Sequence, residues 1–263
     1  MKDLSYASPG LVRDMIRKGE LRGQTSGMCR GYVQGNLVIL PKRLAYDFLL
    51  FTQRNTKSCP VLEVTDTGSR ELKLTAVGSD VAMDIPKYRV YENGELSGEF
   101  FDINSLWRED FVSFILGCSN TFESVLIDEG VGVRHIQAGC NAPVYITNIE
   151  CSPAGIFSGP TVVSMIPIPL DKVVKAVQIT SRYPRAHGAP IHIGNPALIG
   201  IKNINKPDFG DAVEIKENEV PVFWACGVTP QAVAMKTKPE IMITHSPGHM
   251  FITDIKNHEL AVL

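Results

Sequence analysis

The sequence predicts an α/β fold, and two observations carry that prediction. Short apolar runs typical of buried strands alternate with amphipathic segments at helical spacing. The 263 residues are 44% hydrophobic and 21% charged, an ordinary globular composition with ample material for a core. We expect a layered α/β domain formed by both chain ends, residues 1–58 and 165–263, and a smaller α+β domain inserted between them, residues 59–164.

The predicted helices and strands follow one another and are separated by residues that favour turns. Residues 9–19 place apolar side chains on one helical face, and Gly19 is a plausible stop. The apolar run Leu37–Leu40 predicts a strand. A helix should follow it, because the next apolar side chains recur at helical spacing: Ala45, Phe48, Leu49 and Phe51. From Cys59 onwards the runs shorten and alternate, and Asn93-Gly94 predicts a hairpin.

Two apolar runs end in a cysteine and lead into a predicted helix. In the first, GCSNTFE, Asn120 stands three residues before Glu123, which fits a capping box. In the second, VPVFWACGVTPQ, Thr229 followed by proline predicts a helix start at which the hydroxyl caps the free amides. Cys118 and Cys226 therefore stand where a strand passes into a helix.

Two interpretations of Cys226 remain open. The field at a helix start lowers the pKa of a thiol and favours a nucleophilic thiolate. The apolar sequence FWAC has the opposite effect, because desolvation raises a thiol pKa. In that second case Cys226 is a small structural side chain, and the amides of Gly227 and Val228, together with the cap at Thr229, carry the function.

Four of the six histidines fall in two short loops. His245 and His249 follow an apolar run, and His187 and His192 lie in the Gly- and Pro-rich loop HGAPIHIGNP, which we expect to lack regular structure. Histidine suits proton transfer near neutral pH, although each of the four could instead only cap an element. We expect no metal, because Pro247 and its neighbour Gly248 interrupt the spacing of His245 and His249, and the cysteines lack C-x-x-C pairs.

The net charge and the cysteine content limit the classes of binding partner and the compartment that we expect. The formal net charge is -2 without a basic cluster, which argues against nucleic acid and against a membrane surface. The N-terminal segment MKDLSYASPG has no apolar signal region, and no apolar run is long enough to span a membrane. Six scattered cysteines are then best interpreted as reduced thiols in a cytoplasmic protein. A homo-oligomer remains possible, and no cofactor is expected.

Six ordered motifs give the chain a family resemblance. They are GYVQGNLVILP, IPKYRVY, GCSNTFE, HGAPIHIGNP, VPVFWACGVTPQ and THSPGHMFITD. This series resembles the YcsI-type hydro-lyase family, which includes D-glutamate cyclase-like proteins, and it covers nearly the whole chain. The resemblance implies a three-layer α/β/α domain with a second, smaller two-layer domain. It also implies a lyase that removes water, for which the best-known assignment is the cyclisation of D-glutamate to 5-oxo-D-proline.

The chain departs from this family pattern at six positions. Arg30 and Asn195 stand where proline and aspartate are usual. Four positions where arginine is usual carry other residues: Ala82, Cys140, Ile146 and Ile166. Arginine grips a carboxylate with two parallel hydrogen bonds, and isoleucine cannot replace it. Arg89 and Arg134 remain as candidates for a carboxylate clamp, although both could equally form structural ion pairs.

The resulting hypothesis is a hydro-lyase acting on a small amino acid or carboxylate. Glu123, His245 and His249 would share the proton transfers, and Cys226 could attack first and form a thioester. The candidate substrate-binding residues are Cys118, Ser119, Asn120, Gly227, Thr229, His187, His192, Arg89 and Arg134. Strand ends gather along one edge of an α/β sheet, so we expect one pocket to contain Cys118, Glu123, Cys226, His245 and His249. The alternatives are a hydro-lyase with another substrate and a protein that binds a small carboxylate without turning it over.

Overall fold

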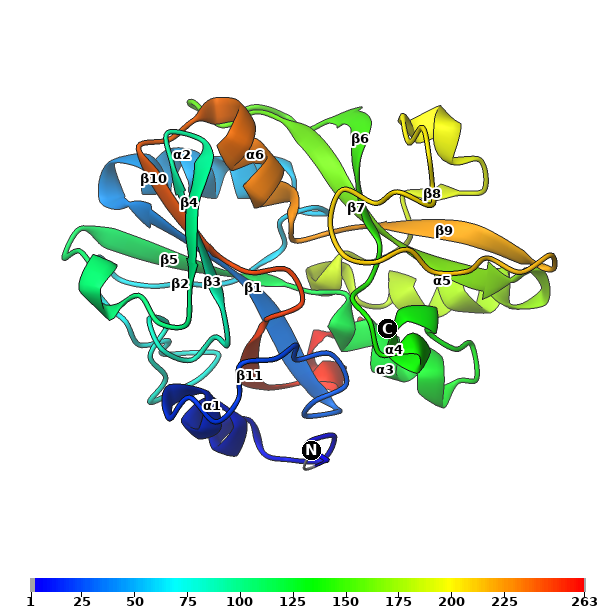
Figure 1. Ribbon diagram of the computed structural model, residues 1–263, viewed down its shortest axis with the longest axis horizontal. Coiled ribbons are helices and arrows are strands. Elements are labelled where there is room, and N and C mark those ends of the chain that lie inside the picture. The colour runs from blue at the N-terminus through cyan, green and yellow to red at the C-terminus, as the bar shows by residue number, and fades with distance from the viewer. Residues whose placement is uncertain (1–2, 263) are drawn as a thin grey trace.

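The structure, a computed structural model that describes residues 3–262, contains two β-sheets that lie side by side (Figure 1). The larger sheet consists of β1 (Tyr32–Pro41), β2 (Val61–Val64), β3 (Tyr88–Glu92), β4 (Glu95–Phe100), β5 (Phe111–Gly117), β10 (Ile241–His245) and β11 (Phe251–Lys256). Its order is β2-β5-β1-β10-β3-β4, and β11 also pairs with β1. The smaller sheet has the order β6-β7-β9-β8 and consists of β6 (Val144–Glu150), β7 (Pro160–Pro169), β8 (His192–Ile193) and β9 (Glu219–Ala225).

Within residues 3–262, six α-helices surround the sheets. They are α1 (Pro9–Arg17), α2 (Lys42–Arg54), α3 (Asn120–Asp128), α4 (Arg134–Ala138), α5 (Val173–Ser181) and α6 (Thr229–Thr237). Short 3-10 helices are η1 (Asn104–Leu106), η2 (Leu170–Lys172), η3 (Pro184–Ala186), η4 (Pro196–Ile199) and η5 (Asn257–Leu260). In Figure 1, α6 lies above and α3 below the region where the two sheets meet. The prediction of a mixed α/β fold is confirmed.

The strands of the expected inserted segment, residues 59–164, are divided between the two sheets. β2 to β5 belong to the larger sheet, where β5 and β3 pair with the chain-end strands β1 and β10. β6 and the first half of β7 belong to the smaller sheet. The domain boundaries, the three-layer arrangement and the second domain stay predictions.

Several local expectations are confirmed, and three need correction. The hairpin at Asn93-Gly94 joins β3 to β4 with positive φ values of 51° and 84°, as a tight hairpin turn requires. The capping box is not formed, because the Glu123 carboxylate bonds the Ser119 hydroxyl and not a backbone N–H. Thr229 is not the cap of α6, since its hydroxyl donates to a carbonyl outside the helix. The HGAPIHIGNP segment contains β8, which was expected to be irregular.

One core joins the two sheets. Trp224 on β9 is fully buried in a cluster that also contains apolar side chains of β1, β5, β7 and α3. Its ring lies 5.9 Å from that of Phe122, and its indole N–H donates to the Thr180 hydroxyl at 3.1 Å. A buried indole N–H needs such a partner. This packing fixes α3 and β9 relative to each other, and both elements lead into the candidate site.

The strand position beside β1 is interrupted. β10 and β11 pair in turn with the same edge of β1, and residues 246–250 leave the sheet between them. Asn36 and Leu37 lie opposite this gap in the ladder, because the pairs on either side of it are Val38 with Thr244 and Gly35 with Phe251. A buried gap in a sheet leaves room for polar side chains and a ligand.

Candidate active site

A small cavity of about 60 Å³ lies where three strands end. β5 and β10 flank β1, and both run antiparallel to it, so their last residues lie at the same edge of the larger sheet. β9 ends at the same place from the smaller sheet. The lining includes Cys118, Ser119, Asn120, Cys226 and His245, all of them candidates from the sequence. These strand ends meet between two antiparallel sheets and not along one edge of a single sheet.

Cys118 and Cys226, two of the three cysteines that line the cavity, are protonated at neutral pH. Burial raises the pKa of Cys226 to about 11, and the nearby N–H of Val228 offsets this only in part. Burial also raises the pKa of Cys118 well above its ordinary value, and the neighbouring Glu123 adds to the rise, while the N–H of Asn120 opposes it. Desolvation therefore outweighs the field at both helix starts.

His245 lines this cavity and is almost fully buried. The side chain is 1% exposed, and its Nδ1 lies 3.5 Å from the Leu37 carbonyl oxygen. Within residues 3–262, Nε2 is buried without a hydrogen-bond partner. Burial lowers the pKa of His245 to about 4, so the ring is neutral and can accept or donate one proton at neutral pH.

His249 is not among the residues that line this cavity, although the sequence grouped it with His245. Its Nδ1 lies 2.9 Å from the carbonyl oxygen of Pro247, within the same loop. Burial lowers its pKa as well. The expectation that all five selected residues line one pocket is therefore met for Cys118, Cys226 and His245 but not for His249, whose ring bonds its own loop, nor for Glu123, which lines a neighbouring cavity.

Glu123 forms a buried cluster with Ser119 and His135. Its Oε1 accepts from the Ser119 hydroxyl at 2.9 Å, and its Oε2 lies 3.3 Å from His135 Nε2. Glu123 is 2% exposed and His135 3%. His135 lines the small cavity, whereas Glu123 lines a larger neighbouring one. A carboxylate that bonds one ring nitrogen orients a histidine for proton transfer through the other.

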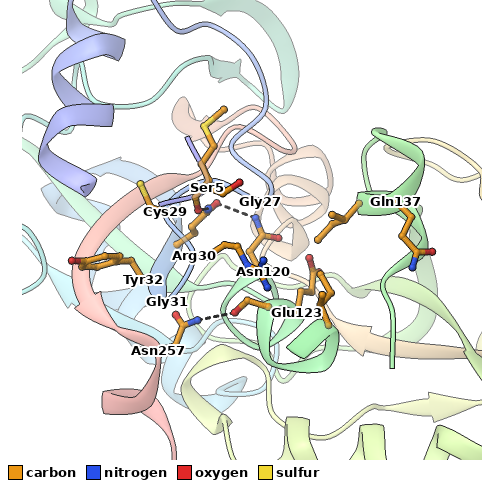
Figure 2. A pocket seen from close by; sticks show the side chains of 15 residues that line it. Ser5, Gly27, Cys29, Arg30, Gly31, Tyr32, Asn120, Glu123, Gln137 and Asn257 are labelled. Carbon is orange, nitrogen blue, oxygen red and sulfur yellow. Dashed lines mark hydrogen bonds between the residues drawn. The ribbon is translucent and has the colours of Figure 1, made fainter. Parts of the chain in front are cut away.

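The larger cavity has a volume of about 260 Å³. Figure 2 shows Asn120 and Glu123 between the loop that carries Gly27 to Gly31 and Gln137 on α4. The loop is fixed in place because Gln34 accepts from Asn120 at 3.0 Å and donates to the Thr25 carbonyl oxygen at 2.9 Å. Asn120 lines both cavities, so they are neighbours across the first turn of α3.

The candidate carboxylate clamp lies elsewhere. Arg89 on β3 pairs with Glu99 at 2.8 Å, and Arg134 on α4 pairs with the buried Glu219. Neither arginine lines the small or the larger cavity. Both have the structural ion-pair role that the sequence left open. Arg30 lines the larger cavity, where it pairs with an aspartate of α3.

Three further candidates do not line the small cavity. His187 is buried with its Nδ1 2.8 Å from the Lys57 carbonyl oxygen, and His192 Nε2 lies 2.7 Å from the carbonyl oxygen of Asn195. The Thr229 hydroxyl accepts from a β7 amide at 3.1 Å and donates to the Cys226 carbonyl at 2.7 Å. Thr229 thus ties the start of α6 to β7 and supports the cavity wall from outside.

Gly227, like these three candidates, does not line the small cavity, but it is in close contact with Asn36, which does. A Cβ placed on Gly227 would lie 2.0 Å from Asn36 Nδ2, so only glycine fits there. Asn36 is 1% exposed, and its amide donates to the Gly117 carbonyl oxygen at 2.7 Å. Asn36 lines the cavity and was missed, although a polar residue inside the apolar run GNLVIL was a usable signal. His135 offered no such signal, because its partner lies in another helix.

Between residues 3 and 262, His, Cys, Asp and Glu side chains form no group of three or more that could hold a metal ion. Over the same range, every helix is too short or too polar to cross a bilayer. The side chains that line the small cavity include thiols, imidazoles, amides and hydroxyls.

Comparison with known proteins identifies the family. A family model described as D-glutamate cyclase matches residues 112–254. Relatives from Clostridium beijerinckii and Psychrobacter arcticus, each named "putative hydro-lyase", are 63% and 60% identical over 98% and 100% of both chains. A nitrogen repressor-like protein from Methanococcus jannaschii aligns with 91% of this chain and 96% of its own at 9% identity, with a TM-score of only 0.37. The relatives and the family model agree over most of the sequence, so the chain belongs to the D-glutamate cyclase family.

Proposed function

We propose that the chain is a cytoplasmic hydro-lyase that acts on a small amino acid or carboxylate, by dehydrative cyclisation of D-glutamate to 5-oxo-D-proline. Family membership supports the reaction type, and the relatives carry hydro-lyase names. The observation that carries the proposal is the buried Ser119–Glu123–His135 cluster beside the small cavity. It supplies an oriented proton carrier without a cofactor.

The reaction requires movement of protons between two substrate groups. The amine must lose a proton before it attacks the γ-carboxyl carbon, and the departing oxygen must gain protons to leave as water. His135 is the proton carrier in this proposal, and Glu123 holds its ring through Nε2. Ser119 in turn holds the carboxylate through its other oxygen. The neutral His245 donates to or accepts from the reacting carboxyl group.

Negative charge on the tetrahedral intermediate needs donors that are already in place. The first turns of α3 and α6 point N–H groups at the cavity, as the contacts of Asn120 and Val228 with the two thiols indicate. Helix starts favour anions without help from a cationic side chain. The α-carboxylate would bind to amides and hydroxyls of the lining, because neither Arg89 nor Arg134 lies there.

The test is conversion of D-glutamate by the purified protein, followed by NMR detection of 5-oxoproline. Histidine removal in His135→Gln should lower kcat by about 10²- to 10⁴-fold, the usual worth of a general acid–base. The carboxylate variant Glu123→Gln should lower kcat by about 10- to 100-fold, because an orienting partner is lost. The surface variant His258→Gln is the matched control and should keep full activity, since this exposed side chain lies outside both cavities. An unchanged kcat in His135→Gln would rule out its role.

The absence of an arginine from the small cavity favours one alternative, a protein that binds a small carboxylate without turnover. This alternative predicts that D-glutamate or 5-oxo-D-proline raises the melting temperature while no product forms. Turnover of another small carboxylate, with D-glutamate inert, would instead indicate a hydro-lyase with a different substrate.

A further inference from the structure

The two sheets repeat one arrangement of strands. The order β2-β5-β1-β10 in the larger sheet matches β8-β9-β7-β6 in the smaller sheet, and every neighbouring pair in both is antiparallel. The registers correspond as well. The end pairs of the central ladders are Gly35 with Gly117 and Pro41 with Phe111 in one sheet, and Val163 with Ala225 and Pro169 with Glu219 in the other.

The helices and connections repeat in the same way. α2 follows β1 as α5, after η2, follows β7, and α3 follows β5 as α6 follows β9. After α3 the chain crosses to β6 in the smaller sheet, and after α6 it crosses to β10 in the larger sheet. Figure 1 shows the two units on either side of the centre, with α2 and α5 on opposite sides. The fold is thus a pseudo-two-fold duplication with exchanged strands.

This duplication makes Cys118 and Cys226 equivalent. Each directly follows the last residue of its strand, and each lies at the start of a nine-residue helix. Each carbonyl accepts an N–H from the threonine three positions later, at 3.1 Å from Thr121 and 3.0 Å from Thr229. The backbone N–H two positions later, of Asn120 and of Val228, also lowers the pKa of each thiol and opposes the effect of burial. Neither cysteine is therefore an isolated thiol.

Both thiols line the same cavity, and they reach it from different sheets. The buried His245 also lines this cavity, and within residues 3–262 its Nε2 has no hydrogen-bond partner, which a polar ligand at the site could supply. Among the described residues that line it, none is Asp, Glu, Lys or Arg. Two equivalent proton carriers that reach one cavity from different sheets are suited to act on the two faces of one carbon atom.

We propose that Cys118 and Cys226 form a two-thiol pair that exchanges the α-proton of the substrate and inverts its α-carbon. The thiolate of Cys226 takes the α-proton, and the electrons of the broken C–H bond move into the carboxylate as an enediolate. The thiol of Cys118 then gives its proton to the opposite face, and the electrons return to form the new C–H bond. The proposal rests on the proposed function for the identity of the substrate.

The assignment of the two roles follows from their surroundings. Burial raises the pKa of Cys226 to about 11 and raises the pKa of Cys118 further. Glu123 adds to the rise at both thiols, and the neighbouring Cys226 adds to the rise at Cys118. The thiol with the lower pKa is the base, and the other is the acid. The helix starts hold the enediolate, since they favour negative charge. The fraction of thiolate, and with it the exchange rate, should rise about tenfold per pH unit from pH 7 to pH 10.

The experiment measures loss of the α-¹H NMR signal in D₂O, with D-glutamate and 5-oxo-D-proline as separate probes. Chiral chromatography measures inversion in the same samples. The wild-type protein should exchange and invert at least one probe, with the stated rise toward high pH. Cys118→Ser and Cys226→Ser should each lower inversion at least about 10²-fold, because a serine hydroxyl is a much weaker base and acid.

Cys151→Ser is the matched control. Its sulfur contacts the Thr161 hydroxyl at 3.4 Å, away from the cavity, and a serine can keep this bond. The control should retain exchange, and far-UV circular dichroism should show that all variants are folded. If a cavity variant does not fold, the pH profile and the inversion of the wild-type protein still test the two-thiol proposal.

Three outcomes would overturn the proposal: no exchange by the wild-type protein at pH 10, exchange without inversion, or inversion that survives in either cavity variant. Formation of 5-oxoproline from D-glutamate is measured separately in the same tubes. Cyclisation without exchange would refute the two-thiol pair alone. Exchange of 5-oxo-D-proline without cyclisation would refute the proposed cyclase alone.

Discussion

Gly227→Ala offers the sharpest test of how the cavity wall is built. The new Cβ would lie 2.0 Å from Asn36 Nδ2, 2.1 Å from its Cγ and 2.4 Å from its Oδ1. No heavy atoms in proteins approach so closely without a bond, so the Asn36 side chain must move. It is 1% exposed and donates to the Gly117 carbonyl oxygen at 2.7 Å. The movement therefore breaks a buried hydrogen bond.

The expected loss in the free energy of unfolding has two contributions. A buried polar group left without its partner costs about 1–3 kcal/mol. Overpacking a filled interior costs about 1–3 kcal/mol more. The free energy of unfolding should fall by about 3 kcal/mol, which corresponds to about 6–12 °C in Tm for a chain of this size. The displaced amide also enters the small cavity, so ligand binding should weaken along with stability.

The assay is urea and thermal unfolding of Gly227→Ala, Asn36→Ala and the double variant. Because the alanine at 36 removes the clashing atoms, Gly227→Ala should cost less than about 1 kcal/mol in that background, a coupling of about 2 kcal/mol. Gly10→Ala is the control, since nothing lies within 4 Å of a Cβ there, and it should be neutral or slightly stabilising. A Gly227→Ala protein as stable as the wild type would show that the wall is not packed as described.

Further predictions address stability, pH and thiol reactivity. Glu63 accepts from three backbone N–H groups and one hydroxyl at 2.6 to 3.0 Å and is 5% exposed, so Glu63→Gln should lower the free energy of unfolding by about 2–4 kcal/mol. Urea titration measures it, with the exposed Glu95→Gln as a control that should change little. Burial lowers the pKa of His187 and of His245 to about 4, so between about pH 6.5 and 4 the unfolded chain holds protons that the folded chain does not. Stability should therefore be complete above pH 6.5 and fall with pH by about 1.4 kcal/mol per unit per histidine, and equal urea midpoints at pH 7 and pH 5 would contradict this. Because burial raises the pKa of Cys226 to about 11, iodoacetamide should leave it unmodified at pH 7.5, as peptide mass spectrometry would show. Saturating alkylation below pH 8.5 would instead reveal an activated thiolate.

The site could be predicted in part because some of its signals are local. The apolar run and the cysteine that ends it stand next to each other in the chain, so Cys118 and Cys226 could be recognised as strand-end residues at the start of helices. The interpretation of Cys226 stayed open, because the helix start and the apolar surroundings act in opposite directions on one pKa. The structure decides the direction, since only the packing determines how far the thiol is removed from water.

The arginines and histidines depended on contacts that no local pattern contains. Arg89 and Arg134 looked suited to a carboxylate ligand, but each meets a glutamate on a neighbouring element. His135 gave no signal and yet pairs with Glu123 across two helices. A charged side chain pairs with an oppositely charged group that lies next to it in the folded chain, and the tertiary structure determines which group that is.

The sequence by itself determined which segments become strands and helices, where the Asn93-Gly94 hairpin turns, and which family the motifs resemble. These properties depend on periodicity and turn chemistry within a few residues. Only the tertiary structure decided that β6 and β10 cross to opposite sheets, and that the expected pocket forms between the two sheets without Glu123 and His249. Strand pairing joins residues more than a hundred positions apart, and it is selected by the packing of whole faces. The sequence at each strand end does not encode that choice.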